Sequence, residues 1–447
     1  MASLPPLTAR LREPALTRGD QPPRMVVPPP GPRARELARL LAEVEAPGVN
    51  TVGSGEPPIL WNQARGANVQ DVDGNLYVDL TAGFGVASVG HRHPRVVDAL
   101  RRQSGRLLHG LADVHAHPLR VELAAALNRL APVDDPRVFF AVSGAEAVEI
   151  AIKTAVLATG RPGILAFEPA YHGLTLGALA ATSRPAFREP FAAHLTTHVR
   201  RLPYGCPPAA VEEALEGAGA GGLLVEPVVG RDGVVFPPAG WLVAIAAACQ
   251  RHRALFIADE ILTGLGRTGW WFAVEADGVR PDLLCCGKAL GGGLPIAAVV
   301  GRAPVMRAWD RPGEALHTST FLASPLACAT ALATLEVMRR ERLPERAVAL
   351  GRTVERHAGE WRQRYRAVRA VRGRGLLWGI ELTSARLAGR WVREALGRGV
   401  LVLPAGPEGN VVQLCPPLTI TPPQLEVALV LLGQALGAAG ASPRAGR

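Results

Sequence analysis

Short apolar runs alternate with helical segments from about residue 90 onward, and this alternation constrains the fold more than any other feature of the chain. Stretches such as GAEAVEIAIKTAVLATG and GWLVAIAAACQRH separate the runs and have helical periodicity. Strand–helix alternation of this kind is typical of βαβ units, whose strands are buried on both faces. The pattern predicts an α/β large domain over residues 90–340, with a mostly parallel central sheet covered by helices. The runs are RVFFAVS, GILAFEPAY, GGLLVEPVV, ALFIADEIL, DLLCCGK and IAAVVGR.

The segments on either side of this domain are expected to form a second, smaller α+β domain made from both chain ends. A chain of 447 residues is too long for one compact core, since single cores stop growing near roughly 250–300 residues. Residues 35–89 contain WNQARGANVQDVDGNLYVDL, whose alternation and DG pair predict a hairpin. Residues 341–447 supply the other part. Residues 1–34 include QPPRMVVPPPGPR, which cannot form a core, so a disordered tail is expected there.

The composition is that of a globular protein and argues against several other classes. The chain is 48% hydrophobic and 20% charged, without an apolar run of the roughly 18 residues that would suggest a membrane span. Its net charge of +10 comes from scattered arginines with few aromatic residues among them, so ordinary solvated charge is favoured over a nucleic-acid partner. The six cysteines have no C-x-x-C spacing, and no secretory signal is visible. These features predict a cytoplasmic protein without a metal site.

The two lysines, Lys153 and Lys288, stand out against 47 arginines. A guanidinium stays protonated, whereas a lysine can lose its proton, attack a carbonyl and form a Schiff base. Lys288 ends an apolar run and is followed by three glycines, in DLLCCGKALGGG. A charge placed there for solubility makes little sense, so Lys288 is the candidate catalytic residue. Lys153 lies late in a predicted helix and is expected to tolerate arginine.

Polar residues end the other apolar runs, at the edge where open α/β sheets bind their ligands. Ser143-Gly144-Ala145 opens a helix and suits a phosphate, although a simple N-cap is the alternative. Tyr171-His172 could stack on a ring, or Tyr171 could be an ordinary core or surface tyrosine. Glu226 ends the third run. Asp259 follows a buried strand and needs a cationic or donor partner. With Lys288, this set matches the requirements of pyridoxal phosphate: phosphate anchor, ring stack, ring-nitrogen partner and reactive lysine.

Five segments in this order resemble the class III pyridoxal-phosphate-dependent aminotransferases, from about residue 55 to residue 420. Asp259 lies 29 residues before Lys288, and the segments are SGAEAVEIAIK, YHG, ADEILTGLGRTG, GKALGGGLPIAAV and HTSTFLASPLACA. The resemblance implies fold type I, a homodimer with shared active sites, and transfer of an amino group from an amine or ω-amino acid donor to a 2-oxo acid by a ping-pong mechanism. A pyridoxal-phosphate-dependent aminomutase, decarboxylase or epimerase is the alternative on the same fold.

The resemblance also implies roles at the matching positions. Lys288 would bind the cofactor through a Schiff base, and Asp259 would pair with the pyridine nitrogen. Gly144-Ala145 would hold the phosphate, Tyr171 would cover the ring, and Thr320 would reach the phosphate of the neighbouring subunit. The full set of expected cofactor-binding positions is Ser143, Gly144, Ala145, Tyr171, His172, Glu226, Asp259, Leu262, Lys288 and Thr320.

Three positions depart from the family pattern. Leu262 stands where many members have a glutamine that contacts the cofactor's phenolic oxygen. Gln413 stands where ornithine-type members have a carboxylate-binding arginine, and Arg231 replaces their glutamate. Arg231 is therefore the candidate for the substrate carboxylate, and a surface arginine paired with Asp232 or a nearby acid is the alternative. Phe84, Arg231 and Gln413 form the expected substrate-binding set.

Two further motifs are weaker. GLGRTG (264–269) fits the G-x-G-x-x-G pattern of dinucleotide-binding proteins. That fingerprint needs a helix directly after its glycines, whereas GWWFAVEADGV resembles a loop, so a nicotinamide cofactor is disfavoured. His91-x-His93 and Asp113-x-His115-x-His117 contain metal-ligand residue types. Proline-flanked histidines in loops are more often turn formers or polar contacts, so no metal is expected there.

Overall fold

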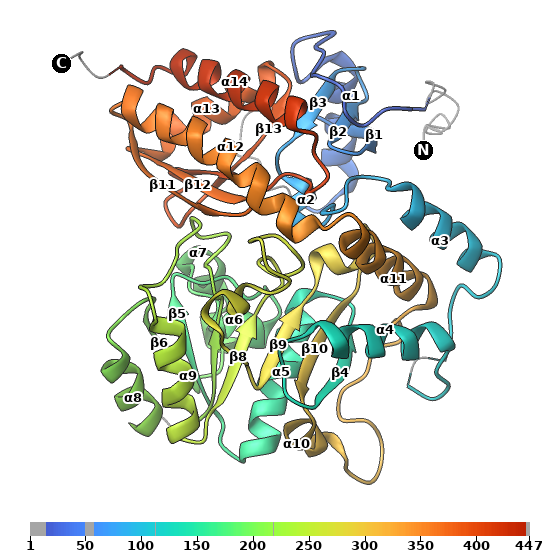
Figure 1. The fold of residues 1–447 in the computed structure, drawn as a ribbon, viewed down its shortest axis with the longest axis vertical. Helices are drawn as coiled ribbons and strands as arrows, with labels where there is room; N and C mark the ends of the chain where they lie inside the picture. The colour runs from blue at the N-terminus through green and yellow to red at the C-terminus, as the bar shows by residue number, and fades with distance from the viewer. Residues whose placement is uncertain (1–14, 50–57, 112, 218, 444–447) are drawn as a thin grey trace.

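A seven-stranded mixed sheet forms the centre of the large domain (Figure 1). The computed structural model of the chain describes residues 15–49, 58–111, 113–217 and 219–443. The strand order is β4-β10-β9-β8-β7-β5-β6, in which β10 is antiparallel to both its neighbours and the other adjacent pairs are parallel. The predicted mostly parallel sheet is therefore confirmed. Its strands are β4 (Pro136–Ala141), β5 (Gly163–Glu168), β6 (Val199–Pro203), β7 (Ala220–Val225), β8 (Leu255–Asp259), β9 (Leu283–Cys286) and β10 (Ala297–Arg302).

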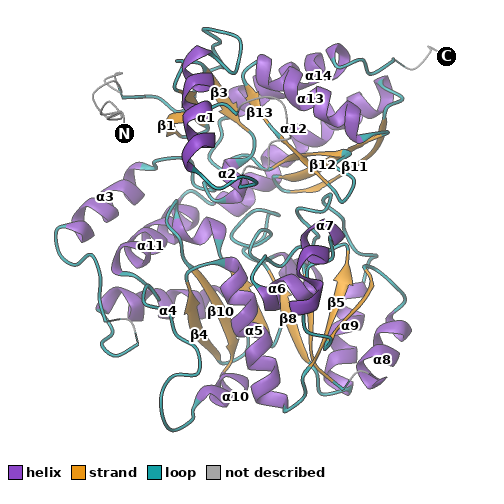
Figure 2. Ribbon diagram, turned by 180° about the vertical axis from the view of Figure 1, so that it is seen from behind, coloured by secondary structure: helices purple, strands orange, loops and turns teal. Residues whose placement is uncertain are grey.

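Helices cover both faces of this sheet (Figure 2), and alternate residues of each strand enter two different cores. Cys285 of β9 packs with α5 (Gly144–Thr159) and α6 (Leu176–Ala181). The next residue, Cys286, packs into the larger core on the other face, with α8 (Pro208–Gly217), α9 (Trp241–Arg251) and α11 (Pro325–Arg340). Period-two alternation with both faces apolar explains why the central residues of these strands are almost all apolar. Also in this domain are α3 (Pro94–Ser104), α4 (Pro118–Leu130), α7 (Pro185–Arg188), α10 (Ala303–Met306) and the 3₁₀ turns η2 (Glu189–His194), η3 (Ala273–Asp277), η4 (Lys288–Gly291) and η5 (Arg307–Trp309).

Side-chain caps fix where several helices begin. Ser143, Ser324, Ser384 and Thr421 each accept a hydrogen bond from the backbone N–H three residues later. Such a cap satisfies one of the donors that a helix N-terminus leaves without a partner. The cap at Ser143 places the start of α5 at the carboxyl end of β4, where the phosphate anchor is expected.

The smaller domain is built from both ends of the chain, as expected. One sheet has the order β1-β2-β3-β13, and its β13 (Val400–Leu401) pairs in parallel with β3 (Leu76–Asp79). The predicted hairpin is the antiparallel pair β2 (Asn68–Asp71) and β3, preceded by β1 (Trp61–Arg65). A second sheet, β11-β12-β15-β14, comprises β11 (Val368–Arg374), β12 (Leu377–Leu382), β14 (Leu403–Ala405) and β15 (Val411–Leu414). The helices are α1 (Pro32–Val44), α2 (Ala82–Gly85), α12 (Leu343–Arg364), α13 (Ala385–Gly397) and α14 (Pro422–Ala438). The domain boundaries near residues 89 and 340 stay a prediction.

The expectation of a disordered tail is wrong for residues 15–34, and residues 1–14 lie outside the described residues. Arg24 forms an antiparallel bridge with Leu76, and the Asn75 side chain accepts hydrogen bonds from the backbone N–H groups of Val26 and Val27. A proline-rich segment cannot build a core of its own, but here the small domain supplies its backbone partners. No helix within the described residues is long and apolar enough to cross a membrane.

Candidate active site

The predicted catalytic residues converge at one edge of the large sheet. The strands β9, β8, β7 and β5 are neighbours and parallel, so their carboxyl ends meet. Asp259 is the last residue of β8 and pairs in register with Cys285 of β9, three residues before Lys288. Glu226 directly follows β7, and Tyr171 lies three residues beyond β5. Residues far apart in sequence are thus brought together by sheet topology alone.

Lys288 has a strained backbone and a perturbed amine. Its φ of 42° lies in the left-handed region, which non-glycine residues rarely adopt and which occurs most often at functional sites. Burial lowers the pKa of the Lys288 ammonium below its usual value, although the negative charges of Asp259 and Glu226 oppose this shift. A lowered pKa increases the fraction of neutral amine, the form that attacks a carbonyl.

Asp259 is buried and held by His172. The side chains are 4% and 2% exposed, and His172 Nδ1 lies 2.7 Å from Asp259 Oδ2. Burial alone would lower the pKa of His172, but the hydrogen bond and charge of Asp259 outweigh it and the pKa is raised. The Ile261 N–H donates to Asp259 Oδ1 at 3.1 Å, so both carboxylate oxygens are held in place. His172 Nε2 is buried and has no hydrogen-bond partner among the described residues.

The start of α5 lies against the residues that flank this pair. A Cβ built on Gly144 would approach Ile261 Cδ1 at 3.0 Å. A Cβ on Gly173, which has a φ of 126°, would come within 2.6 Å of Ala145 Cβ. Glycine at position 173 therefore allows the loop after β5 to meet the helix N-terminus. The structure thus brings the expected phosphate anchor next to the Asp259–His172 pair.

Glu226 joins two loops of the site. Its carboxylate accepts a hydrogen bond from the Tyr171 N–H at 2.9 Å and one from the Gly230 N–H at 3.0 Å. Burial raises the pKa of Glu226 to about 7. Since both donors are backbone groups, this carboxylate fixes the position of Tyr171 relative to the loop that carries Arg231.

The Arg231 guanidinium stacks over the Tyr171 ring, with 4.5 Å between its Cζ and the ring centroid. The Asp232 carboxylate binds Arg184 through Oδ1, and no ion pair between Arg231 and Asp232 is present among the described residues. Arg231 has no carboxylate partner among the described residues, while its charge acts on Lys288 and lowers the amine's pKa. Arg184, which the sequence did not single out, thus pairs with the carboxylate next to Arg231.

The other predicted positions differ in their surroundings. A Cβ built on Gly85 would lie 2.9 Å from Leu262 Cδ1 and 3.8 Å from Lys288 Cδ. Leu262 and Lys288 therefore both lie against the loop of Gly85. Phe84, next to Gly85, is 57% exposed and also has a positive φ. Gln413 donates from Nε2 to the Gly230 carbonyl at 3.2 Å. Of the expected substrate set, Gln413 is thus in contact with the loop that carries Arg231.

Thr320 is the exception, because this chain does not bring it to Lys288 by any contact. It lies in an exposed loop and its side chain makes no hydrogen bond with the described residues. The adjacent Phe321 is 63% exposed. The structure therefore does not bring Thr320 into the group of residues around Lys288.

The weaker motifs have structural roles. Arg267 of GLGRTG is 1% exposed and donates hydrogen bonds to the carbonyls of Leu376 and Pro416, so this loop joins the two domains. No helix follows the glycines directly, as expected for a motif that does not bind a dinucleotide. His91 contacts Asp79 at 2.7 Å, and His117 contacts the Ala323 carbonyl at 2.8 Å.

These features are an α/β fold with a buried carboxylate and a lysine of lowered pKa at one edge of its large sheet. Residues 49–436 match the family model described as aminotransferase class-III. The chain belongs to the class-III aminotransferase family and is a pyridoxal-phosphate-dependent aminotransferase.

Characterised relatives agree with this assignment. An acetylornithine aminotransferase from Methanopyrus kandleri is 42% identical over 383 residues, which cover 86% of this chain and 95% of the relative. One from Mycobacterium tuberculosis is 41% identical over 392 residues, which cover 87% and 94%. The structure of ornithine aminotransferase from Toxoplasma gondii, which has partial occupancy of pyridoxal phosphate at its active site, superimposes with a TM-score of 0.83 at 31% identity. That superposition covers 91% of this chain and 94% of the other.

The residues present fit pyridoxal phosphate. The helix N-terminus at Gly144 offers backbone N–H groups to a phosphate, and Lys288 offers an amine to the carbonyl. The buried Asp259 carboxylate suits a protonated ring nitrogen, and the unpartnered Nε2 of His172 leaves one polar atom available beside it. Tyr171 provides an aromatic face, already stacked with Arg231 on one side.

Proposed function

We propose that the enzyme transfers an amino group from an amine or ω-amino acid donor to a 2-oxo acid by a ping-pong mechanism. This proposal rests on one observation: the Asp259–His172 pair and the Lys288 amine, whose pKa is lowered, lie at the same edge of the large sheet. The bound cofactor supplies a carbonyl that takes up the amine and a ring that accepts the electrons released when the adjacent C–H bond breaks.

Each residue has a distinct part in this chemistry. The Lys288 amine would carry the proton between the substrate carbon and the carbon of the cofactor's carbonyl group. Asp259 holds a proton at the cofactor's ring nitrogen, and His172 keeps the carboxylate oriented for this. Gly144-Ala145 binds the phosphate through backbone N–H groups, and Tyr171 keeps water off one face of the ring. Glu226, Leu262 and Ser143 position these groups.

Half-reactions distinguish amino transfer from the other chemistries of this fold. A donor without acceptor should convert the cofactor's visible absorbance to that of its amine form, and a 2-oxo acid should restore it. Full turnover should yield one amino acid per ketone or aldehyde formed. Release of carbon dioxide, loss of stereochemistry or migration of the amino group, without transfer to the 2-oxo acid, would contradict the proposal.

We propose further that Arg231 binds the carboxylate of the amino or oxo substrate, with Gln413 and Phe84 beside it. The relatives are named for acetylornithine, yet this chain has neither the glutamate nor the arginine of the ornithine-type pattern. A forked, permanently charged donor without an acidic partner suits bidentate carboxylate binding. Acetylornithine should therefore be tested beside simple amines and other ω-amino acids, and pyruvate beside 2-oxoglutarate.

We also propose a homodimer, and the compartment we propose is the cytoplasm. All six cysteines are free, and five are buried, as in a reducing environment.

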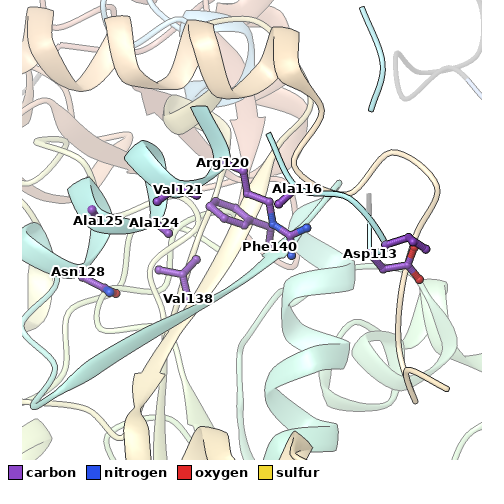
Figure 3. A pocket seen from close by; sticks show the side chains of 10 residues that line it. Asp113, Ala116, Arg120, Val121, Ala124, Ala125, Asn128, Val138 and Phe140 are labelled. Atoms are coloured by element: carbon purple, nitrogen blue, oxygen red, sulfur yellow. The ribbon is translucent and has the colours of Figure 1, made fainter. Parts of the chain in front are cut away.

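The candidate interface is the apolar surface around Thr320. The His109 and Phe321 rings are 5.4 Å apart. Residues of α4 and β4, together with Asp113, Val114 and Ala116, line a cavity of about 600 Å³ (Figure 3). The exposed apolar residues of this surface are Leu107, Leu108, Leu111, Val114, Val121, Leu316 and Phe321. A second copy of the chain is the occupant that would also bring Thr320 to a phosphate.

Subunit mixing tests the shared site. Lys288→Ala and Thr320→Val proteins should each have low activity, but a hybrid dimer would contain one site with both defects and one with neither. Mixing should therefore restore a substantial fraction of wild-type activity. Subunit exchange can be followed with two affinity tags. A hybrid dimer of proven composition that stays inactive would show that Thr320 does not act across the interface.

A further inference from the structure

The loop that carries Thr320 is fastened to α5 of its own subunit. Trp309 donates a hydrogen bond from Nε1 to Thr154 Oγ1 at 2.9 Å. Phe139 packs against Trp309, with 5.0 Å between ring centroids, and against His317 at 6.0 Å. His317 lies three residues before Thr320, and its side chain is only 14% exposed. An otherwise exposed loop thus has a well-packed anchor close to Thr320.

Lys153, the second of the two lysines, completes this anchor. Its Nζ lies 3.0 Å from His317 Nδ1. An ammonium can only donate a hydrogen bond, so Nδ1 must accept it and the ring proton lies on Nε2. That nitrogen lies 3.4 Å from Glu146 Oε1 but forms no hydrogen bond with it or with any other described residue. Both ring nitrogens of His317 therefore lie beside residues of α5.

Glu146 connects the anchor to the phosphate site of the same subunit. Its other oxygen, Oε2, accepts a hydrogen bond from the Val142 N–H at 2.6 Å, and its own N–H is capped by Ser143. Glu146 immediately follows Gly144-Ala145, the expected phosphate anchor. One end of α5 thus borders the subunit's own phosphate site, while its side chains hold the loop of Thr320.

We propose that His317 is a positioning residue that couples the two cofactor sites of the dimer. Held by the hydrogen bond from Lys153 and packed against Phe139, it fixes the loop so that Thr320 meets the partner's phosphate. A change at the start of one α5 is then transmitted to the other subunit's site. The proposal rests on the shared site proposed above, and the experiment separates the two.

The test measures cofactor affinity in hybrid dimers that have a single reactive lysine. In the first hybrid, one subunit carries Lys288→Ala and His317→Ala and the other is wild type. The loop with the substitution then serves the only competent site. In the second hybrid, Lys288→Ala and His317→Ala are on different subunits, so the competent site is served by an intact loop. Pyridoxal phosphate is titrated into the apo hybrids, and the absorbance of the lysine-bound form is recorded.

The first hybrid should bind the cofactor about 3- to 10-fold more weakly than a hybrid without the His317 substitution, the range expected for one lost hydrogen bond. The second should show a smaller loss. His317→Asn keeps an acceptor near Nδ1 and should recover part of the affinity, and Lys153→Arg should retain it where Lys153→Met does not. Equal losses in both hybrids, a loss only in the second, or no loss would overturn the coupling.

Thr320→Val in the same two arrangements is the matched control. A loss with Thr320→Val in the first arrangement, without one for His317→Ala, would leave the shared site intact and reject His317 as its positioning residue. If Thr320→Val has no effect in the first arrangement, the shared site itself fails, and the coupling fails with it.

Discussion

Replacing Lys288 by alanine is expected to lower the rate of amino transfer by on the order of 10⁴-fold or more, because both the covalent attachment and the proton carrier are lost. The variant should still fold. The change removes one partly buried side chain at the site rim and relieves the cost of desolvating its amine. Single-turnover kinetics with donor and with acceptor measure the effect on each half-reaction.

A chemical control separates loss of the lysine from loss of the fold. Borohydride should irreversibly bleach the yellow wild-type enzyme and attach the cofactor to Lys288. The alanine variant should bind the cofactor without being labelled, and its thermal unfolding should resemble that of the wild type. Appreciable turnover by the variant, or labelling at Lys153 in the wild type, would refute the assignment.

Replacing Arg231 by alanine is expected to lower kcat/KM for the 2-oxo acid by about 2–4 kcal/mol, the cost of leaving a buried carboxylate without its charged partner. At 25 °C this corresponds to roughly 30- to 1,000-fold. A simple amine donor without a carboxylate should be spared, because it makes no ion pair with the guanidinium. Arg231→Lys should recover only part of the loss, since an ammonium cannot form the bidentate pair.

Arg374→Ala is the matched control for this experiment. Its guanidinium also stacks on an aromatic ring, 5.2 Å from the centroid of Phe236, but it belongs to β11 and not to the loop after β7. This variant should behave like the wild type toward both substrates. A similar loss for Arg231→Ala on amine and 2-oxo acid, or no loss on either, would show that the substrate carboxylate binds elsewhere.

The sheet and its reactive edge could be predicted from the sequence because both depend on local patterns. Residues at the ends of parallel strands share an edge whatever the rest of the chain does. Lys288, Asp259 and Glu226 could therefore be placed together from the positions of three apolar runs. The cap at Ser143 was equally local, since it needs only a serine before a helical segment.

The contacts that the sequence did not reveal are those between segments distant along the chain. The Arg184–Asp232 pair decides the environment of Arg231, yet nothing near Arg184 indicates its partner. His317 belonged to a recognised motif, but its contact with Lys153 depends on how a long loop folds back on α5. Residues 15–34 were misjudged for the same reason, because their hydrogen-bond partners lie in the hairpin and not within the segment.

The parallel pairing of β3 with β13 has a consequence for the order in which the enzyme is assembled. Because one partner comes early and the other late in the chain, this sheet cannot close until nearly the whole polypeptide has left the ribosome. The large sheet uses only residues between these two strands and can form first. Gly85 and Cys415, which lie close to each other beside Lys288, belong to the late-closing part. The part of the fold that carries Lys288 can therefore form before the small-domain residues that cover this lysine are in place. Burial of the Lys288 side chain is expected among the last steps of folding.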